Sequence, residues 1–157
     1  MAKKSDNEVK GLKELERALI ALQKEYGGKA AAQALRPAVK AALKPVEAKV
    51  KGQTPVDSGD LRDSTSLKIG AVTKKMKHSN HYSSTTVIAG RAGWFWRKPS
   101  LWHQALAVEF GTRNTPATHT LEQVFDSEVR GMTKRFKDTL GPAIEKKAKQ
   151  LAKKAKK

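Results

Sequence analysis

Apolar residues near the start of the chain recur at spacings of three and four, the period of one face of an α-helix. They are Val9, Leu12, Leu15, Leu19, Leu22 and Tyr26. Ser5 and Glu8 have the spacing of a capping box, and Gly27 with Gly28 offers the positive φ that ends many helices. The pattern therefore predicts a first helix that ends at Tyr26.

A second apolar stripe keeps the helical period although Pro37 and Pro45 fall inside it. Each proline removes one backbone donor and is expected to start or bend a helix. The sequence therefore predicts a kinked helix that ends at Gly52. The stripe consists of Leu35, Val39, Ala42, Val46 and Val50.

The segment QTPVDSGDLRDS then combines proline, glycine and short polar residues, which is typical of an ordered turn. Asp57 or Ser58 is expected to cap a single helical turn through Leu61 and Arg62.

Two extended segments follow. In the first, Leu67, Ile69 and Ala71 alternate with Lys68 and Gly70. The second, from Tyr82 to Ala89, is rich in β-branched side chains. We expect two antiparallel strands. The polar segment TKKMKHSNH between them is longer than a tight hairpin and is predicted to be a projecting interaction loop.

All three tryptophans lie in the short segment RAGWFWRKPSLW. One interpretation places these rings in the core at the edge of the sheet. The other places them in a subunit interface, where Trp and Arg are enriched. The pattern does not choose between the two. The candidate interface residues are Trp94, Phe95, Trp96, Arg97 and Trp102.

The remaining pattern is helical, first over Leu101 to Phe110 and then along a stripe from Leu121 to Ile144 that is interrupted at Gly141 and Pro142. These elements predict an α+β fold in which N-terminal amphipathic helices and a long C-terminal helix pack on a small antiparallel sheet. Residues 1–145 are expected to form one domain, and residues 146–157 a lysine-rich tail or helix end.

The composition adds a strong positive charge. The 157 residues include 32 Lys and Arg against 15 Asp and Glu, for a formal net charge of +17, which favours polyanions or acidic protein faces as partners. The absence of cysteine excludes disulfides and thiolate metal sites. No stretch approaches the roughly 18 apolar residues of a membrane span, and no secretory leader pattern opens the chain, so we expect no membrane partner and no export.

No catalytic, metal-binding or cofactor-binding pattern is found. His78 and His81 have a spacing that could share a metal, but no nearby carboxylate completes the site. Asp57, Asp60 and Asp63 lack the other ligands of a calcium loop and are better explained by capping. The sequence thus predicts a protein that is not an enzyme and needs no cofactor.

The lysine-rich end of the chain has two interpretations. It could neutralise DNA phosphates, with Lys153, Lys154, Lys156 and Lys157 as the candidate polyanion contacts. Alternatively, the lysines are solvated and stabilise the C-terminal end of a helix dipole, which is the favoured interpretation.

Two motifs, TPVDSGDLRDS at residues 54–64 and VEFGTRNTPA at residues 108–117, resemble a phage family of tail-completion proteins, the gene-product-ten-like tail components. Order and spacing also match, although residues 118–121 depart from the Pro-Phe-Leu-Arg-Pro-like segment usual in that family. The matching residues are Pro55, Asp57, Gly59, Leu61, Arg62, Ser64, Glu109, Phe110, Gly111, Thr112, Pro116 and Ala117.

The matched residues are of types that shape the backbone. Gly59 and Gly111 suit tight turns, and Asp57 and Thr112 can accept hydrogen bonds from free N–H groups. Arg62 could pair with Glu109, either across the fold or between neighbouring subunits. The two motifs are therefore expected to have an architectural role.

The resemblance implies a structural virion protein of the neck or the top of the tail, present in the host cytoplasm during assembly. It implies a closed sixfold ring of identical subunits between a head connector or stopper and a tail terminator or tail tube protein. The basic charge of such a ring would suit acidic neighbours or DNA in its channel. The alternative from charge alone is a non-specific or packaging-associated DNA-binding protein, which the two motifs do not support.

Overall fold

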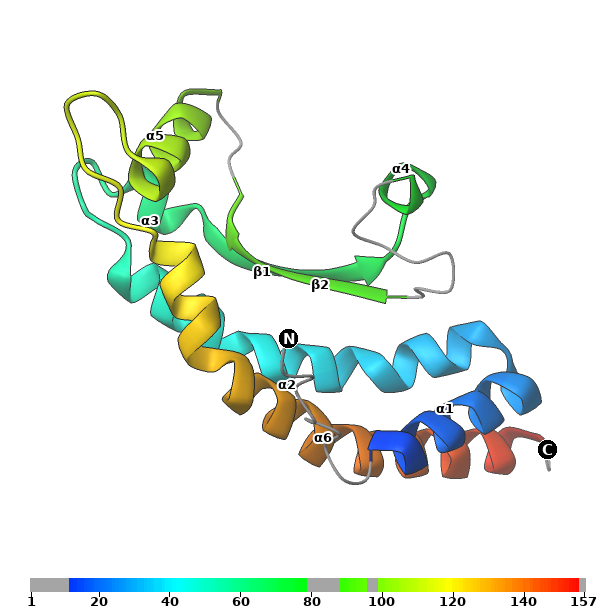
Figure 1. Cartoon of the computed structure of the whole chain (residues 1–157). Coiled ribbons are helices and arrows are strands. Elements are labelled where there is room, and N and C mark those ends of the chain that lie inside the picture. The colour runs from blue at the N-terminus through cyan, green and yellow to red at the C-terminus, as the bar shows by residue number, and fades with distance from the viewer. Residues whose placement is uncertain (1–11, 79–87, 96–98, 156–157) are drawn as a thin grey trace, which may run out of the picture.

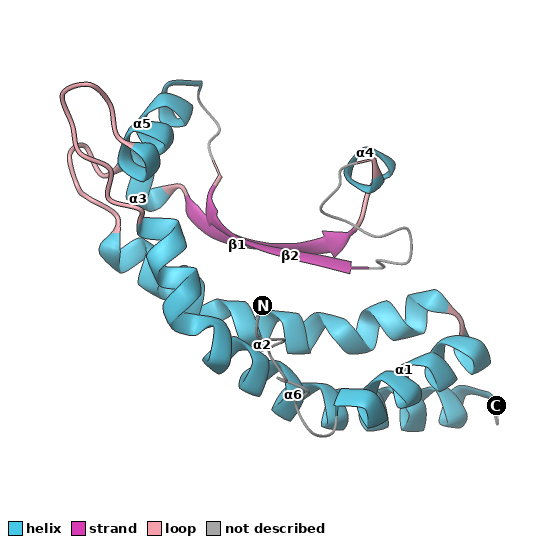
Figure 2. Cartoon of the chain, viewed as in Figure 1, coloured by secondary structure: helices cyan, strands magenta, loops and turns pink. Residues whose placement is uncertain are grey.

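The structure is a computed structural model that describes residues 12–78, 88–95 and 99–155. Figure 2 shows helices around one small sheet. The predicted α+β fold, with a long C-terminal helix and an antiparallel sheet, is confirmed. The elements are α1 (Leu12–Tyr26), α2 (Gly28–Gln53), α3 (Asp60–Asp63), β1 (Thr65–Ala71), α4 (Lys74–Lys77), β2 (Ile88–Trp94), α5 (Pro99–Phe110) and α6 (Thr120–Ala155).

Helix α2 is the central element of the fold. It contacts both strands of the sheet and also packs against α1 and α6, which contact each other. Figure 1 shows the resulting arrangement, with the sheet over one side of α2 and α6 running along another. The helices α1, α2 and α6 form a bundle near the C-terminus, whereas α3 and α5 lie at the opposite end, beside the start of α6 (Figure 1).

The first two helices largely follow the apolar pattern. Gly27 has a φ of 82° and separates α1 from α2, as predicted. The predicted capping box of Ser5 and Glu8 lies outside the described residues. Helix α2 ends at Gln53, one residue beyond the prediction, and Thr54 caps it by donating its hydroxyl to the carbonyl oxygen of Val50 at 2.6 Å.

The prolines neither start nor end the long helices. Pro37 and Pro45 lie inside continuous α2, and α6 continues through Pro142 to Ala155, so the predicted interruption at Gly141 and Pro142 is wrong. A proline inside a helix costs about 3 kcal/mol. Packing on both sides of Pro142 offsets this cost, because Leu140 and Ile144 are buried and residues further along α6 pack against the same core.

The sheet is antiparallel, as predicted, with Thr65 opposite Trp94 and Ala71 opposite Ile88. The second strand, however, runs from Ile88 to Trp94, so the predicted end at Ala89 is wrong; residues 82–87 lie outside the described part. The β-branched residues placed the predicted strand too early in the chain. The glycine-containing segment after them pairs with β1 and buries Trp94. Side-chain packing of this kind, rather than β propensity alone, decides where a strand lies. The predicted polar loop contains the short helix α4.

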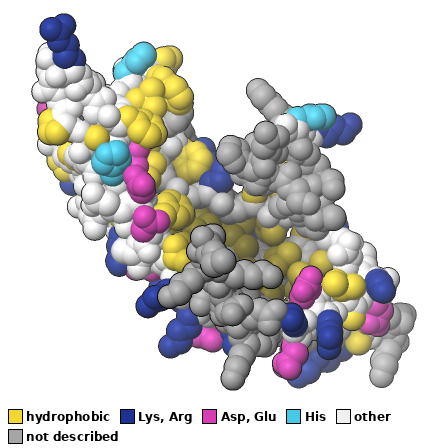
Figure 3. Space-filling view, in the orientation of Figure 1, with side chains coloured by type: hydrophobic (Ala, Val, Ile, Leu, Met, Phe, Trp, Pro, Cys, Tyr) yellow, Lys and Arg dark blue, Asp and Glu magenta, His cyan; other side chains and the backbone are white. Residues whose placement is uncertain are grey.

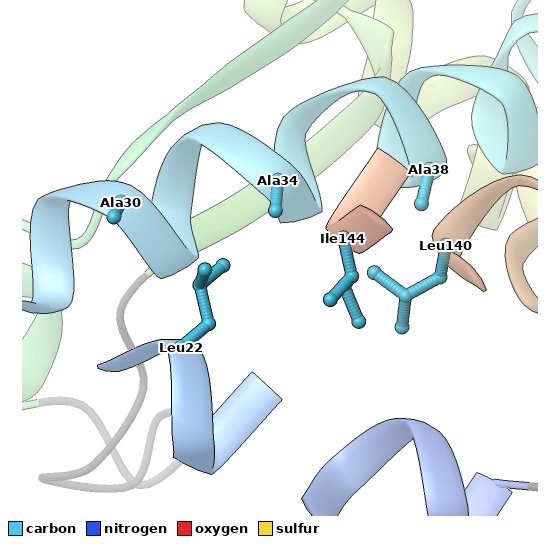
Figure 4. Packing of buried hydrophobic residues seen from close by; sticks show 6 residues of the cluster. All are labelled: Leu22, Ala30, Ala34, Ala38, Leu140 and Ile144. Carbon is cyan, nitrogen blue, oxygen red and sulfur yellow. The ribbon is translucent and has the colours of Figure 1, made fainter. Parts of the chain in front are cut away.

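Two hydrophobic cores lie along α2 and α6. The first, here called the bundle core, joins α1, α2 and α6, and Figure 4 shows its buried side chains converging between these helices. The second, the junction core, joins α2 and α6 to α3, α5 and β2. The bundle core contains Leu22, Ala30, Ala34, Ala38, Leu140 and Ile144, and the junction core Val46, Val50, Leu61, Trp94, Ala105 and Val124.

The sheet approaches α2 closely at Gly90. A Cβ at this position would lie 2.4 Å from a methyl carbon of Val39 and 2.6 Å from one of Leu43. We expect Gly90→Val to lower the free energy of unfolding by about 2–4 kcal/mol, because the side chain must push the sheet away from α2. Urea unfolding of the variant measures this loss.

The matched control for Gly90 is Gly70→Val in the facing strand. A Cβ at Gly70 meets nothing within 4 Å, so this variant should be neutral or slightly stabilising. Equal destabilisation by both variants would show that lost strand flexibility, rather than contact with α2, is the cause.

Candidate functional site

The first motif, residues 54–64, forms a loop and the short helix α3. Gly59 has a φ of 85°, in the left-handed region that glycine tolerates, and it precedes α3 directly. The hydroxyl of Ser58 accepts a hydrogen bond from the N–H of Asp60 at 3.4 Å. Ser64 donates its hydroxyl to the carbonyl oxygen of Leu61 at 2.6 Å, and the Leu61 side chain is buried in the junction core. The motif is therefore a locally bonded turn anchored by one leucine.

Trp94 closes this turn from the sheet. Its indole N–H donates to the hydroxyl oxygen of Thr54 at 2.9 Å, while the same hydroxyl caps α2. The residue is only 6% exposed. Trp94 thus occupies the core of the chain, as the first interpretation of the tryptophan cluster has it.

The other residues of that cluster differ in position. Phe95 is half-buried, and its ring centre lies 4.1 Å from the Nζ of Lys68 and 5.7 Å from the Cζ of Arg91, within reach of cation–π attraction. Trp102 on α5 is 42% exposed. Trp96 and Arg97 lie outside the described residues.

The second motif holds the start of α6. Glu109 is buried at the end of α5, and its two carboxylate oxygens accept hydrogen bonds from the N–H groups of Leu121 at 2.9 Å and Glu122 at 3.1 Å. These N–H groups lie in the first turn of α6 and have no partner inside that helix. Glu109 therefore caps α6 from another helix.

This cap corrects the suggested pairing of Arg62 with Glu109 across the fold. Both carboxylate oxygens of Glu109 accept hydrogen bonds from α6, and the Nε of Arg62 lies 3.7 Å from a carboxylate oxygen of Asp63 instead. The physical reason is that the unpaired amides at the start of α6 need an acceptor, and the fold places Glu109 beside them. Pairing of Arg62 between neighbouring subunits stays a prediction.

The loop after Glu109 is a tight turn. Gly111 has a φ of 75°, and a Cβ there would lie 2.8 Å from the backbone nitrogen of Ala117 and 2.9 Å from the carbonyl oxygen of Thr115. Thr112 accepts hydrogen bonds at its hydroxyl from the N–H groups of Asn114 and Thr115, as predicted for this residue type. The turn is therefore closed by its own backbone and by one hydroxyl. Pro116 is exposed at its end.

The fold brings the first motif beside α5, whose last three residues begin the second motif. Pro55, Val56 and the following loop residues face Gln104, Ala107 and Val108 of α5 across a groove of about 240 Å³. We call this the motif groove. Val56 at its rim is 60% exposed. An apolar groove with exposed apolar rim residues is typical of an interaction surface.

A second apolar feature lies on another side of α5. Trp102, Leu106 and Phe110 follow one another at intervals of four residues, so they form one row along the helix. We call this the aromatic row. Phe110 is 69% exposed, and Figure 3 shows hydrophobic side chains gathered over this end of the molecule. The aromatic row and the motif groove are thus two different apolar surfaces on one helix.

An ionic cluster between α2 and α6 was not predicted from the sequence. Glu128, only 8% exposed, is contacted by the Nζ of Lys49 and by a guanidinium nitrogen of Arg135, both at 2.5 Å. Arg135 also donates to the carbonyl oxygen of Ala42 at 3.3 Å. One feature of the sequence could have indicated this cluster: Glu128 lies midway between Val124 and Met132, on the apolar stripe of α6, where a charged residue needs a partner.

The hydrogen bond from Lys49, followed by that from Arg135, holds the pKa of Glu128 below its ordinary value of 4.5. The ionised form is therefore favoured in the folded state, and the resulting stability is present above pH 4.5 and lost as the pH falls through the lower folded pKa. We expect Glu128→Gln to lower the melting temperature at about pH 7 and to differ less from the wild type at about pH 3. Thermal unfolding at both pH values measures this.

Glu145→Gln is the control for the ionic cluster, because Glu145 is exposed on the same helix. It should change the melting temperature little at either pH. A constant difference between Glu128→Gln and the wild type across this pH range would contradict the assigned cause.

The remaining candidate residues include the lysines at the end of α6. Lys153 and Lys154 are exposed in the last turn of α6, and Lys156 and Lys157 lie outside the described residues. Within the described ranges, no group of three potential metal ligands is found. His81 is outside these ranges. No described helix has the length and apolar character needed to cross a membrane.

Comparison with known proteins identifies a family. A sequence model of the family described as "Bacteriophage HK97-gp10, putative tail-component" matches residues 14–111, which is more than half of the chain. The matched segment includes the whole first motif and reaches Gly111 in the second. No curated protein and no solved structure matches the chain significantly.

Proposed function

Because the chain belongs to the bacteriophage HK97-gp10-like family of tail components, we propose that it forms a closed ring in the phage neck that joins the head connector to the tail. Family membership makes it a structural component of the virion that contacts other virion proteins. The proposal adds the ring, its sixfold symmetry and its place between a connector or stopper and a tail terminator or tail tube protein.

The observation that carries the proposal is the pair of apolar surfaces on α5. A ring of identical subunits needs a heterologous interface, in which one surface of a subunit meets a different surface of the next. The motif groove is concave, whereas the aromatic row ends in a protruding phenyl ring, so the two are complementary in shape. In the proposed interface, Phe110 of one subunit fills the motif groove of its neighbour.

The charge of the chain supports the proposed neighbours. A net charge of +17 favours acidic faces on the connector and the tail terminator, and it favours DNA within the channel. Like net charges repel across a ring of such subunits, so we expect the apolar contacts to supply most of the binding energy between copies. This division of roles agrees with exposed aromatic residues at α5 and exposed lysines at the far end of α6.

Cryo-electron microscopy of intact virions tests the position of the chain. A ring built from it between the portal and the tail tube would support the proposal. A particle that lacks the chain would overturn the neck assignment and favour the alternative of a packaging-associated DNA-binding protein.

Cysteine cross-linking tests the interface itself, since the chain has no native cysteine. Val56→Cys and Arg113→Cys, which leaves Phe110 in place, are introduced into separate chains of different size, and the chains are mixed under assembly conditions. The proposed interface predicts a mixed cross-linked dimer. In the control, Val129→Cys at an exposed position on α6 takes the place of Val56→Cys, and the yield of cross-linked dimer should be much lower.

A further inference from the structure

Helix α2 carries a row of positive charges on its outer side. Arg36, Lys40 and Lys44 follow one another at intervals of four residues, so they lie on one face at steps of about 6 Å. All three side chains are exposed. We call this set the α2 basic row. It lies away from the buried alanines and valines of the same helix.

The α2 basic row borders a groove between α2 and the sheet. The groove holds about 420 Å³ and is lined by the three basic residues, by Leu67 and Ile69 of β1, and by Glu47. A second groove of similar volume lies between α2 and α6, where Gln33 and Pro37 face Lys146 and Lys147. Positive side chains therefore line depressions on both sides of the same stretch of α2.

The charges of the row are not neutralised within the part of the chain that the structure describes. No ion pair is formed there by Arg36, Lys40 or Lys44, whereas Lys49 on the same helix contacts the Glu128 carboxylate at 2.5 Å. Like charges four residues apart destabilise a helix. A polyanion bound to the row would relieve this repulsion.

We propose that the α2 basic row is a binding site for the phosphate backbone of duplex DNA. The three charges span about 12 Å of helix, a length over which one DNA strand presents about three or four phosphates. Arginine and lysine reach phosphates with long side chains, and such contacts read no base sequence. The site is distinct from the lysine-rich end of α6 and does not depend on ring formation.

The test is binding of the full chain to a labelled duplex of about 30 base pairs, measured by fluorescence anisotropy between about 50 and 400 mM salt. The variant is R36Q/K40Q/K44Q, and the control is R17Q/R130Q/K134Q, which removes the same number of exposed positive charges from α1 and α6. Circular dichroism of each variant should match that of the wild type, because the substituted side chains that the structure describes are exposed.

Loss of three phosphate contacts should reduce the slope of log affinity against log salt by about 2.7, and should weaken binding at about 100 mM salt by roughly two orders of magnitude. We expect this for R36Q/K40Q/K44Q and a much smaller change for the control. Equal changes in both variants would overturn the site, because they would reflect net charge alone. Wild-type protein that binds an acidic peptide but not the duplex would also overturn it.

Discussion

Replacing Phe110 by serine should prevent incorporation of the chain into tails and reduce the titre of infectious phage by at least about a hundredfold. Truncating a central aromatic residue costs about 2 kcal/mol or more at one interface. In a closed ring of identical subunits this loss recurs at every interface. The proposed role of Phe110 as the residue that fills the neighbouring motif groove therefore predicts a large effect, measured by complementation of a phage that lacks the gene.

The fold of the subunit should survive this substitution, because Phe110 is 69% exposed. The melting temperature of Phe110→Ser should stay within about 2 °C of the wild type. Ile20→Ser removes another exposed apolar side chain, on α1, and serves as the control with normal titre. A normal titre for Phe110→Ser would remove the aromatic row from the interface.

Glu109→Ala should strongly lower the free energy of unfolding of the subunit. The substitution leaves the N–H groups of Leu121 and Glu122 without the carboxylate that accepts their hydrogen bonds. Hydrogen bonds to a charged group contribute about 1.5–3 kcal/mol each, and the two share one side chain, so we expect a loss of about 2–4 kcal/mol. Chemical denaturation followed by circular dichroism measures it.

Glu122→Ala tests whether α6 is stabilised by the hydrogen bonds that Glu109 accepts or only by a negative charge near its N-terminal end. It removes one negative charge from the same end of α6, but the Glu122 side chain is exposed. Its expected cost is below about 1 kcal/mol. Equal losses in the two variants would indicate that the negative charge near the helix dipole, rather than the cap, stabilises α6.

Much of the helical structure could be predicted because packing follows the apolar period. The stripes of α1, α2 and α6 face the two cores, and Gly27 ends α1 as expected. The error at Gly141 and Pro142 has a physical cause. Helix propensity includes the cost of the backbone donor that Pro142 lacks. It does not include the packing of Leu140 and Ile144 against α1 and α2, which stabilises the helix on both sides of the proline.

The candidate site could be predicted only in part. The motifs indicated turns at Gly59 and Gly111 from residue type alone. The cap on α6 joins Glu109 to residues 12 and 13 positions later, after a turn whose path no local pattern gives. The groove between Val56 and Val108 likewise depends on how α5 packs beside the first motif. Such contacts arise from tertiary structure.

The position of α2 in both cores has a mechanical consequence. At 1.5 Å per residue its 26 residues span about 39 Å, and α6 lies along it on the way from the junction core to the bundle core. Neither end can tilt alone without breaking packed contacts, so the subunit should behave as a stiff lever. A small rotation imposed on α5 by a neighbour would then swing the distant end of α6 through a larger arc.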